Sequence, residues 1–158
     1  MEPTQRVQEA LDSLGMSAKV IAFEGSTATA RNAADAVGCE LGQIVKTLMF
    51  SADGRPTVVL AAGDGQVDTG KLARLLGVGR KKLKMCSPDQ VLTLTGYEVG
   101  GVSPVGIPET HDVVLDESLR QFDRVWAAAG TPNAVFESTP VELADKLIGQ
   151  WADILRTG

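Results

Sequence analysis

The sequence predicts an α+β fold, in which a central mixed β-sheet of six to seven strands is flanked by about five helices. Two patterns indicate this fold. Apolar residues at helical spacing alternate with short apolar or β-branched runs along the whole chain, and some of the runs are joined by hairpin signals such as Asp53-Gly54. Hairpins make antiparallel neighbours, whereas strands separated by a helix can pair in parallel, so a mixed sheet follows.

Helical and strand patterns follow one another in the first half of the chain. Apolar spacing predicts a helix over residues 4–14, and an alanine-rich helix is predicted over residues 30–37; a glycine follows each of them. The polar residues 25–29 form a turn before the second helix. Strands are predicted over residues 19–23, 44–50 and 57–62.

The second half continues the alternation. Helices are predicted to begin at three caps, Asp68, Ser87 and Thr139, the last two being capping boxes, and a short helix is predicted over residues 117–122. The last helix is predicted to extend to Ile154, because four apolar residues recur at helical spacing and line one face of it: Leu143, Leu147, Trp151 and Ile154. Strands are predicted over residues 83–85, 112–115, 125–129 and 134–137.

Length and composition are those of an ordinary globular protein. The chain has 158 residues, 44% of them hydrophobic and 22% charged, so we expect a single domain over residues 1–158 that buries its core without a metal or a disulfide. The formal net charge of −5 argues against a protein that coats DNA or RNA through a general basic field. It permits recognition of one end of an RNA at a local site.

Cysteine and histidine are too few for a metal site of the usual spacing. The chain contains Cys39, Cys86 and His111, with no CxxC motif. We therefore expect no metal and no cofactor. The first residues lack the apolar core of a signal peptide, and no run approaches the roughly 20 apolar residues of a membrane span. These features favour a reduced, cytoplasmic setting without a membrane partner.

One lysine lies where packing gives no reason for it. Residues 44–50 form a short apolar run that reads as a strand buried on both faces, and Lys46 lies in its middle. A buried ammonium must find an anion, lower its pKa or reach water along its stem. Lys46 is therefore either a structural lysine, which reaches solvent or pairs with an internal carboxylate, or a functional one.

A glycine-rich loop is the second candidate for a site. Residues 97–108 contain three glycines and two prolines, so no regular element is expected there. Within it, Gly100 and Gly101 would let the backbone approach a ligand and direct its N–H groups, and Pro104 would stiffen the turn. The loop is either a holder for an oxyanion or a structural crossover.

Other chemistry has little support in the sequence. A nucleophilic triad is not credible, because His111 is the only imidazole and Ser103 and Cys86 lack an evident base. No phosphate-binding GxxxxGK[ST] motif occurs. Asp116 can be a helix cap and Asn133 a turn residue. The basic run Arg80, Lys81, Lys82 and Lys84 is either a solvated face or a patch that contacts a nucleic-acid backbone.

At this point the sequence resembles a known family, the YbaK/ProX group of aminoacyl-tRNA deacylases, which is similar to the editing domain inserted in bacterial prolyl-tRNA synthetases. Four segments carry the resemblance and cover nearly the whole chain: AADAVGCELGQIVKTLMF, TGYEVGGVSPVGIP, DVVLDESL and AGTPNAVFESTPVEL. The resemblance implies a compact α+β domain that hydrolyses in trans the ester of a mischarged tRNA, often tRNA(Pro). It implies as partners the 3′ end of an aminoacyl-tRNA and a prolyl-tRNA synthetase.

The resemblance also implies roles for single residues. Lys46 matches the essential lysine of the family, and Gly100 and Gly101 belong to the loop whose backbone amides hold the ester; these three are the candidate catalytic residues. The candidate substrate-binding residues are Phe23, Thr47, Met49, Val102, Ser103, Pro104, Asp116 and Asn133. Phe23 stands where cysteine-specific members have a tyrosine, and residues 130–133 replace their GKRG turn. Both changes weaken a specific Cys-tRNA(Pro) assignment. Because a pocket discriminates one methylene by only about 1–3 kcal/mol, overlap among small amino acids such as alanine, serine, threonine and cysteine is expected.

Two other functions are compatible with these residues. One is a non-catalytic module of the same fold that binds aminoacyl-tRNA or a synthetase. The other is a hydrolase of small esters or thioesters that ignores RNA. The presence of Lys46 and of both glycines favours the deacylase over the binding module.

Overall fold

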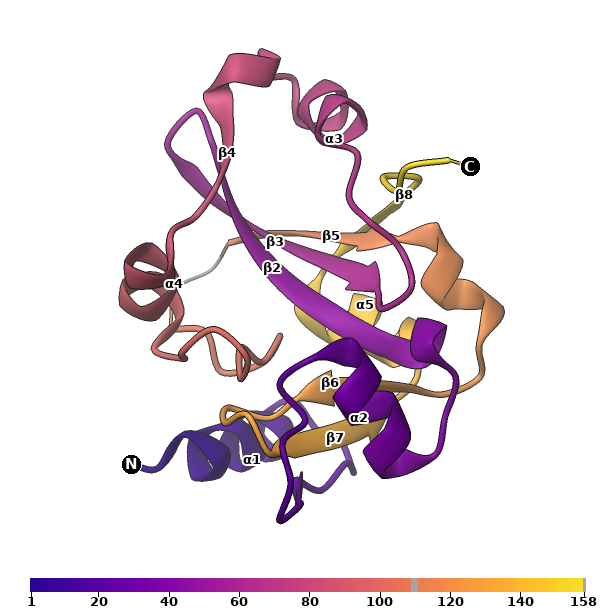
Figure 1. Ribbon diagram of the computed structural model, residues 1–158. Coiled ribbons are helices and arrows are strands. Elements are labelled where there is room, and N and C mark those ends of the chain that lie inside the picture. Colours follow the sequence, from indigo (N-terminus) through magenta and orange to yellow (C-terminus); the bar gives the residue numbers. More distant parts are fainter. Residues whose placement is uncertain (109–110, 158) are drawn as a thin grey trace.

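The computed structural model describes residues 1–108 and 111–157, and in this part of the chain five α-helices surround one eight-stranded sheet (Figure 1). The α-helices are α1 Pro3–Ser13, α2 Ala30–Val37, α3 Thr69–Leu76, α4 Pro88–Thr95 and α5 Pro140–Leu147. Three short 3₁₀ helices are η1 Leu41–Gln43, η2 Arg80–Lys82 and η3 Glu117–Gln121. The strands are β1 Ile21–Ala22, β2 Ile44–Ala52, β3 Arg55–Ala62, β4 Leu83–Met85, β5 Asp112–Asp116, β6 Val125–Ala128, β7 Ala134–Ser138 and β8 Gln150–Ala152.

The sheet is mixed, as the sequence predicts. Its order is β1-β7-β6-β2-β3-β5-β8, and the short strand β4 pairs with the far end of β2. Three contacts are parallel, between β2 and β6, β3 and β5, and β5 and β8, while the hairpins β2–β3 and β6–β7 are antiparallel. The predicted fold class is confirmed, with one strand more than the upper number expected.

The β2–β3 hairpin is the centre of the sheet. Its two-residue turn has positive φ at both positions, 51° at Asp53 and 84° at Gly54, which is the geometry that suits a tight hairpin. Ala52 and Arg55 close the turn, and the register continues to Val45 opposite Ala62. Six of the eight residues of β3 are buried. Residues of this strand belong to the hydrophobic clusters on both faces of the sheet, so the hairpin joins the two clusters.

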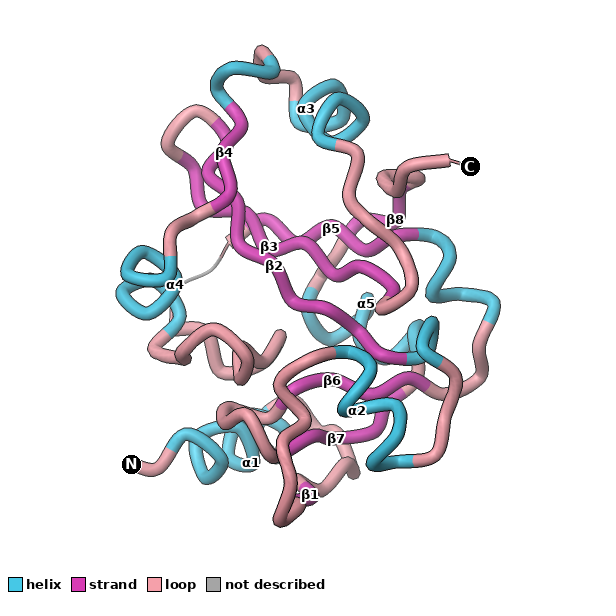
Figure 2. The backbone as a smooth tube through the Cα atoms, in the orientation of Figure 1, coloured by secondary structure: helices cyan, strands magenta, loops and turns pink. Residues whose placement is uncertain are grey.

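Helices cover both faces of the sheet (Figure 2). On one face α1, α4 and α5 bury their apolar sides against β2 and β3, through residues such as Leu11, Val91 and Leu143. On the other face α3 packs Leu72 against Phe50. Helix α2 forms a separate small cluster beside the start of β2. Among the described residues, no helix is both long and apolar enough to cross a membrane.

The end of the chain differs from the prediction. Helix α5 stops at Leu147, because Ile148 adopts a left-handed backbone with φ of 53° and Gly149 packs so tightly that a Cβ there would lie 2.3 Å from Leu115 Cδ1. Residues 150–152 then pair in parallel with β5 as strand β8. The helical spacing of Trp151 and Ile154 was therefore misleading, because pairing with a distant strand determines the structure there.

The glycine-rich loop is held against α1 by one arginine. Arg6 donates hydrogen bonds to the carbonyl oxygens of Thr95 and Gly106, and its guanidinium lies 4.2 Å from the centre of the Tyr97 ring. The Tyr97 hydroxyl in turn donates to Val105 O over 2.7 Å. These contacts join both ends of the loop to the helix, so the loop has a fixed position on the sheet.

Candidate functional site

A gap in the sheet lies along the middle of β2. Strand β6 pairs with β2 only at residues 44–45, and β4 pairs with it only at residues 50–52. In a two-residue hairpin the pair that closes the turn, here Ala52 and Arg55, is joined by backbone hydrogen bonds. Along antiparallel strands, hydrogen-bonded pairs alternate with pairs whose N–H and C=O groups point outward. Thr47 is therefore a residue whose N–H and C=O point away from β3, toward the gap.

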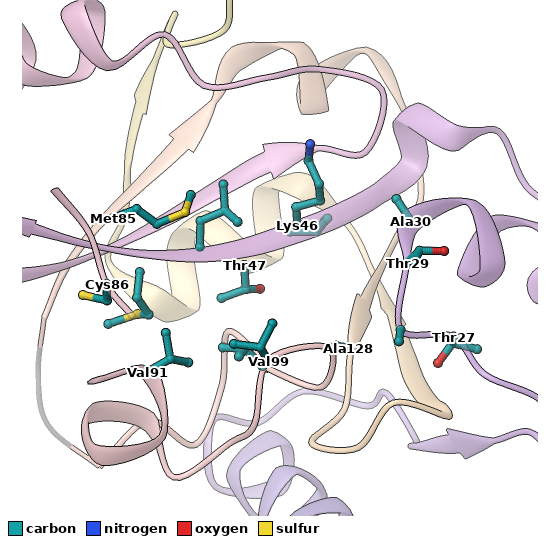
Figure 3. Close-up of a pocket in the computed structure, with 16 residues that line it drawn as sticks. Thr27, Thr29, Ala30, Lys46, Thr47, Met85, Cys86, Val91, Val99 and Ala128 are labelled. Atoms are coloured by element: carbon teal, nitrogen blue, oxygen red, sulfur yellow. The ribbon is translucent and has the colours of Figure 1, made fainter. Parts of the chain in front are cut away.

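A cavity of about 320 Å³ occupies this gap. Its walls come from distant parts of the chain: Thr27–Ala30, Val45–Met49, Met85, Cys86, Val91, Val99, Gly100, Val102 and Ala128. Most of these side chains are apolar, and Figure 3 shows Val91 and Val99 facing Thr47 across the cavity. A small, mostly apolar cavity with a few polar groups is the usual form of a small-ligand site.

Lys46 lies at the edge of this cavity and not at its centre. Its stem lines the wall, while its amine points away from Val99 (Figure 3) and donates a hydrogen bond to Gly65 O in the loop after β3. Partial burial lowers the pKa of Lys46, and the nearby Asp64 carboxylate opposes this shift. Among the described residues Lys46 forms no ion pair, so a carboxylate does not neutralise it.

The lowered pKa of Lys46 predicts how stability depends on pH. The folded protein loses this proton at a lower pH than the unfolded chain, whose lysines titrate near pH 10.4. Between the two pKa values the unfolded state binds more protons, so stability rises with pH. We expect the free energy of unfolding of wild type, minus that of Lys46→Met, to increase toward pH ~10.4. Urea unfolding at several pH values measures this difference, and a decrease would contradict the burial of the ammonium.

Thr47 presents unpartnered polar groups to the cavity. Its Oγ1 is buried and has no hydrogen-bond partner within the described part of the chain. Its main-chain groups face the gap between β6 and β4. Buried polar groups are normally paired, so these atoms are free to bind a polar ligand.

The glycine-rich loop meets the cavity at Val99, Gly100 and Val102. Gly101 N donates to Glu98 O over 3.0 Å, which closes a turn with Gly100 at φ of 99°. A positive φ in this position of a turn suits glycine. Within residues 1–108 and 111–157, the amides of Gly100 and Val102 have no hydrogen-bond acceptor, and both residues line the cavity.

Gly101 has a different geometry from the one expected. Its N–H is engaged by Glu98, so it is not free to donate to an oxyanion, and its carbonyl accepts from Gly130 N over 2.9 Å. A Cβ at this position would lie 2.8 Å from Thr131 Cα. A role of Gly101 in catalysis stays a prediction, and the contacts indicate that such a role would act through packing of the loop against the β6–β7 turn.

Five predicted substrate-binding residues do not line the cavity. Ser103 is fully buried and accepts from Val105 N, while Pro104 faces a different hollow, next to α1 and α5. Asn133 donates to Phe23 O over 2.9 Å and so ties the β6–β7 turn to the end of β1. Phe23 packs beside α2. The described contacts of Ser103, Asn133 and Phe23 are structural.

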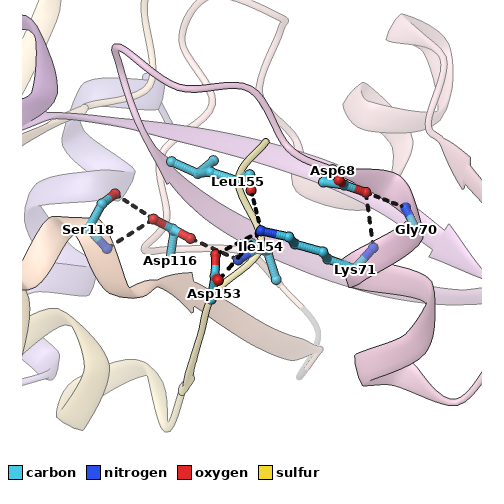
Figure 4. Close-up of polar contacts among 8 residues, drawn as sticks. All are labelled: Asp68, Gly70, Lys71, Asp116, Ser118, Asp153, Ile154 and Leu155. Atoms are coloured by element: carbon cyan, nitrogen blue, oxygen red, sulfur yellow. Dashed lines mark hydrogen bonds and ion pairs between the residues drawn. The ribbon is translucent and has the colours of Figure 1, made fainter. Parts of the chain in front are cut away.

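Asp116 also makes structural contacts (Figure 4). It is 2% exposed, one carboxylate oxygen accepts from the backbone and hydroxyl of Ser118, and the other accepts from Ile154 N over 2.9 Å. It therefore caps η3 and holds the residues after β8. The alternative reading of Asp116 as a helix cap agrees with this geometry.

Several cavity residues were not singled out from the sequence. The sequence predicts a turn and a helix start at Thr27–Ala30, and in the structure these residues form one wall, where Thr29 caps α2 by accepting from Asn32 N. Met85 and Cys86 reach the cavity because β4 pairs with β2. Burial raises the pKa of the Cys86 thiol, so it is an apolar wall residue and not an activated nucleophile.

The fold and the site together define a mixed-sheet domain with a small apolar cavity, free main-chain donors at two of its walls and one ammonium at its edge. The chain belongs to the aminoacyl-tRNA editing domain family, whose pattern matches residues 24–146. This family, related to the editing insertion of prolyl-tRNA synthetases, contains aminoacyl-tRNA deacylases. The family resemblance stated from the sequence is therefore confirmed.

Individual relatives cover the chain to different extents. The uncharacterized protein YwhH of Bacillus subtilis is 38% identical over 139 residues, 87% of each chain. EbsC of Enterococcus faecalis, named as a candidate Cys-tRNA(Pro)/Cys-tRNA(Cys) deacylase, is 31% identical over 80% of this chain and 76% of its own. A proline–tRNA ligase of Nitratidesulfovibrio vulgaris is 35% identical over 75% of this chain, but that match covers 20% of the ligase.

A solved structure agrees with the whole fold. A crystal structure described as a candidate trans-editing enzyme for prolyl tRNA synthetase is 42% identical to this chain, with a TM-score of 0.92, and the match covers 100% of this chain and 99% of the other. The structure of the hypothetical protein APE2540 is 29% identical, with a TM-score of 0.88, over 96% of this chain and 99% of the other.

Proposed function

We propose that this protein hydrolyses, in trans, the ester bond between a small non-cognate amino acid and the 3′-terminal adenosine of tRNA(Pro). The observation that carries the proposal is the position of Lys46, an ammonium that forms no ion pair with a carboxylate of residues 1–108 and 111–157, at the edge of a small apolar cavity in a member of the editing family. The names of EbsC and of the candidate trans-editing enzyme support tRNA(Pro) as the RNA.

In this proposal the parts of the substrate occupy different parts of the site. The amino-acid side chain enters the apolar cavity beneath Thr47, and the nucleotide end remains at the edge, where Lys46 pairs with a phosphate or a polar group. Lys46 then positions the ester and does not attack it. Its partial burial strengthens its interaction with an anion compared with a solvated lysine.

The chemical step needs a water molecule and donors for the oxyanion. Water adds to the ester carbonyl, the free amides of Gly100 and Val102 stabilise the oxyanion that develops, and the bond to the ribose oxygen breaks. The ribose oxygen takes a proton, which gives the free amino acid and uncharged tRNA. No group of the protein forms a covalent bond in this scheme.

Thr47 is expected to contribute to substrate binding through its hydroxyl. In Thr47→Val the shape and the strand propensity are kept but Oγ1 is lost, so a buried unpaired group disappears. We expect stability to stay the same or rise by up to about 1 kcal/mol. The deacylation rate should fall about tenfold, the effect of losing about 1.4 kcal/mol of binding. Single-turnover kinetics and thermal unfolding measure both quantities, and an unchanged rate would remove the hydroxyl from the site.

A panel of charged tRNAs tests the proposal. tRNA(Pro) is charged in turn with alanine, cysteine, serine, threonine or proline and incubated with the protein. We expect one or more small amino acids to be released well above the spontaneous rate while Pro-tRNA(Pro) is spared. Overlap among the small amino acids is expected, since a pocket distinguishes one methylene by only about 1–3 kcal/mol. Equal cleavage of amino-acid esters without RNA would instead indicate a general esterase.

A further inference from the structure

The positive charge of the chain is concentrated in one segment. Six of its 15 Lys and Arg residues and none of its 20 Asp and Glu residues lie between Thr69 and Pro88. The rest of the chain therefore has nine basic residues against 20 acidic ones. In an acidic protein, one basic segment concentrates the positive potential locally and does not create a general basic field.

Four of these basic residues form an exposed ridge, which we call the basic ridge: Arg80, Lys81, Lys82 and Lys84. In the described part of the chain none of them forms an ion pair. Lys71 differs, because it pairs with Asp153 over 3.3 Å and donates to Leu155 O (Figure 4). Within the described residues, the charges of the basic ridge are thus not neutralised by ion pairs.

The basic ridge leads directly to the cavity. Strand β4 follows η2 at once, and its last residue, Met85, lines the cavity. Because a strand rises about 3.3 Å per residue, Lys82 lies within roughly 10 Å of Met85. In Figure 1 this segment runs from the end of α3 through β4 toward α4, beside β2.

The basic ridge begins beside the helix that covers the Lys46 face of the sheet. Met85 is the cross-strand partner of Phe50, so the two side chains lie on the same face of the sheet. Lys46 lies on this face too, because it is four residues from Phe50 along β2. Helix α3 covers this face, and Arg80 lies next to its start, where its charge helps lower the pKa of Asp68, after the larger effect of the Lys71 amide. Lys46 and Met85 also both line the cavity, so an anionic chain that reaches Lys46 can continue past Met85 onto the basic ridge.

We propose that the basic ridge binds backbone phosphates of the tRNA acceptor stem while its 3′ end lies in the cavity. This inference rests on the proposed function for the identity of the RNA. Phosphate contacts fix the position of a nucleic acid but do not read its sequence. The basic ridge therefore places the 3′ end at Lys46, and the choice between amino acids remains with the cavity.

The test uses an uncharged RNA hairpin with the acceptor-stem duplex and a single-stranded CCA end, and its binding is measured by fluorescence anisotropy between 50 and 200 mM salt. The variant is Lys81→Gln/Lys82→Gln. Its matched control is Lys19→Gln/Lys146→Gln, which removes the same charge from exposed positions outside the basic segment. Each lost phosphate contact should lower the slope of log affinity against log salt by about one unit.

Across this salt range wild type should lose about tenfold more affinity than the Lys81→Gln/Lys82→Gln variant, while the control behaves like wild type. Parallel slopes for wild type and the ridge variant would overturn the inference. Should the double variant unfold, Lys84→Gln is used, with an expected change of about one unit.

Deacylation measured on the same proteins separates the two proposals. Hydrolysis of mischarged tRNA by wild type, together with parallel slopes, rejects the basic ridge and keeps the proposed function. Binding that depends on the basic ridge, without any hydrolysis, supports the basic ridge and rejects the proposed function.

Discussion

Lys46→Met is expected to lower the rate of deacylation at least about 100-fold while the protein remains folded. The ammonium positions the nucleotide end of the substrate, and a misplacement of about 1 Å can cost 10²-fold in rate. Methionine keeps the apolar stem that lines the cavity and removes the ammonium, whose pKa is lowered by burial. Single-turnover hydrolysis of the best mischarged tRNA, with thermal unfolding in parallel, measures both effects.

Lys71→Met is the matched control for this prediction. Lys71 is also a partly buried lysine, but it is engaged with Asp153 and Leu155 O. Its loss should reduce stability by up to about 1 kcal/mol, because the partner Asp153 is 68% exposed and Leu155 O is only partly buried, and should leave the rate of the folded protein close to wild type. A Lys46→Met protein with a wild-type rate would show that the ammonium is structural.

Gly101→Ala is expected to shift the glycine-rich loop and to lower both stability and activity. A Cβ would lie 2.8 Å from Thr131 Cα and 2.9 Å from the carbonyl carbon of Gly130. Both are backbone atoms, so no side-chain rotation relieves the contact. Overpacking of this kind costs about 1–3 kcal/mol. A loop moved by about 1 Å would carry Gly100 and Val102 away from the ester and reduce the rate about 100-fold.

Gly79→Ala is the control for the loop variant. Gly79 also has a φ that other residues adopt, and a Cβ there would meet nothing within 4 Å. Its replacement should change stability by less than about 1 kcal/mol and should not alter the rate. If Gly101→Ala behaves like Gly79→Ala in urea unfolding and in deacylation, tight packing of the loop is not required.

The parts of the fold that depend on local signals could be predicted from the sequence. The Asp53-Gly54 turn has the positive φ values that such a pair favours, so the β2–β3 hairpin and its register were predictable. The cap at Ser87 forms the complete capping box expected from its residues. At Thr139 only half of the box forms, since the Glu142 carboxylate accepts from Ser138 Oγ instead.

Long-range pairing determined the parts that could not be predicted. Trp151 lies at helical spacing from Leu147, yet it pairs with Leu115 in the sheet. The cavity could not be predicted either, because residues 27–30 and 85–86, which line it, are distant in sequence and are brought to it only by the fold. Lys46 was predictable as a candidate site residue since a charge inside an apolar strand is unusual by itself, and the structure places it at the cavity. The polar residues Asp116 and Asn133 lacked such a signal, and their contacts are those of caps and turns.

The most direct test of the central claim compares binding with cleavage in wild type. The protein is mixed in excess with Ala-tRNA(Pro), and bound RNA and released alanine are followed in the same reaction. The same reaction is run with tRNA(Pro) carrying cysteine, serine or threonine, and our account predicts that at least one of these bound complexes releases its amino acid much faster than the free aminoacyl-tRNA does. A complex that forms with any small aminoacyl-tRNA(Pro) and protects its ester from hydrolysis would contradict the account and would identify the protein as a binding module.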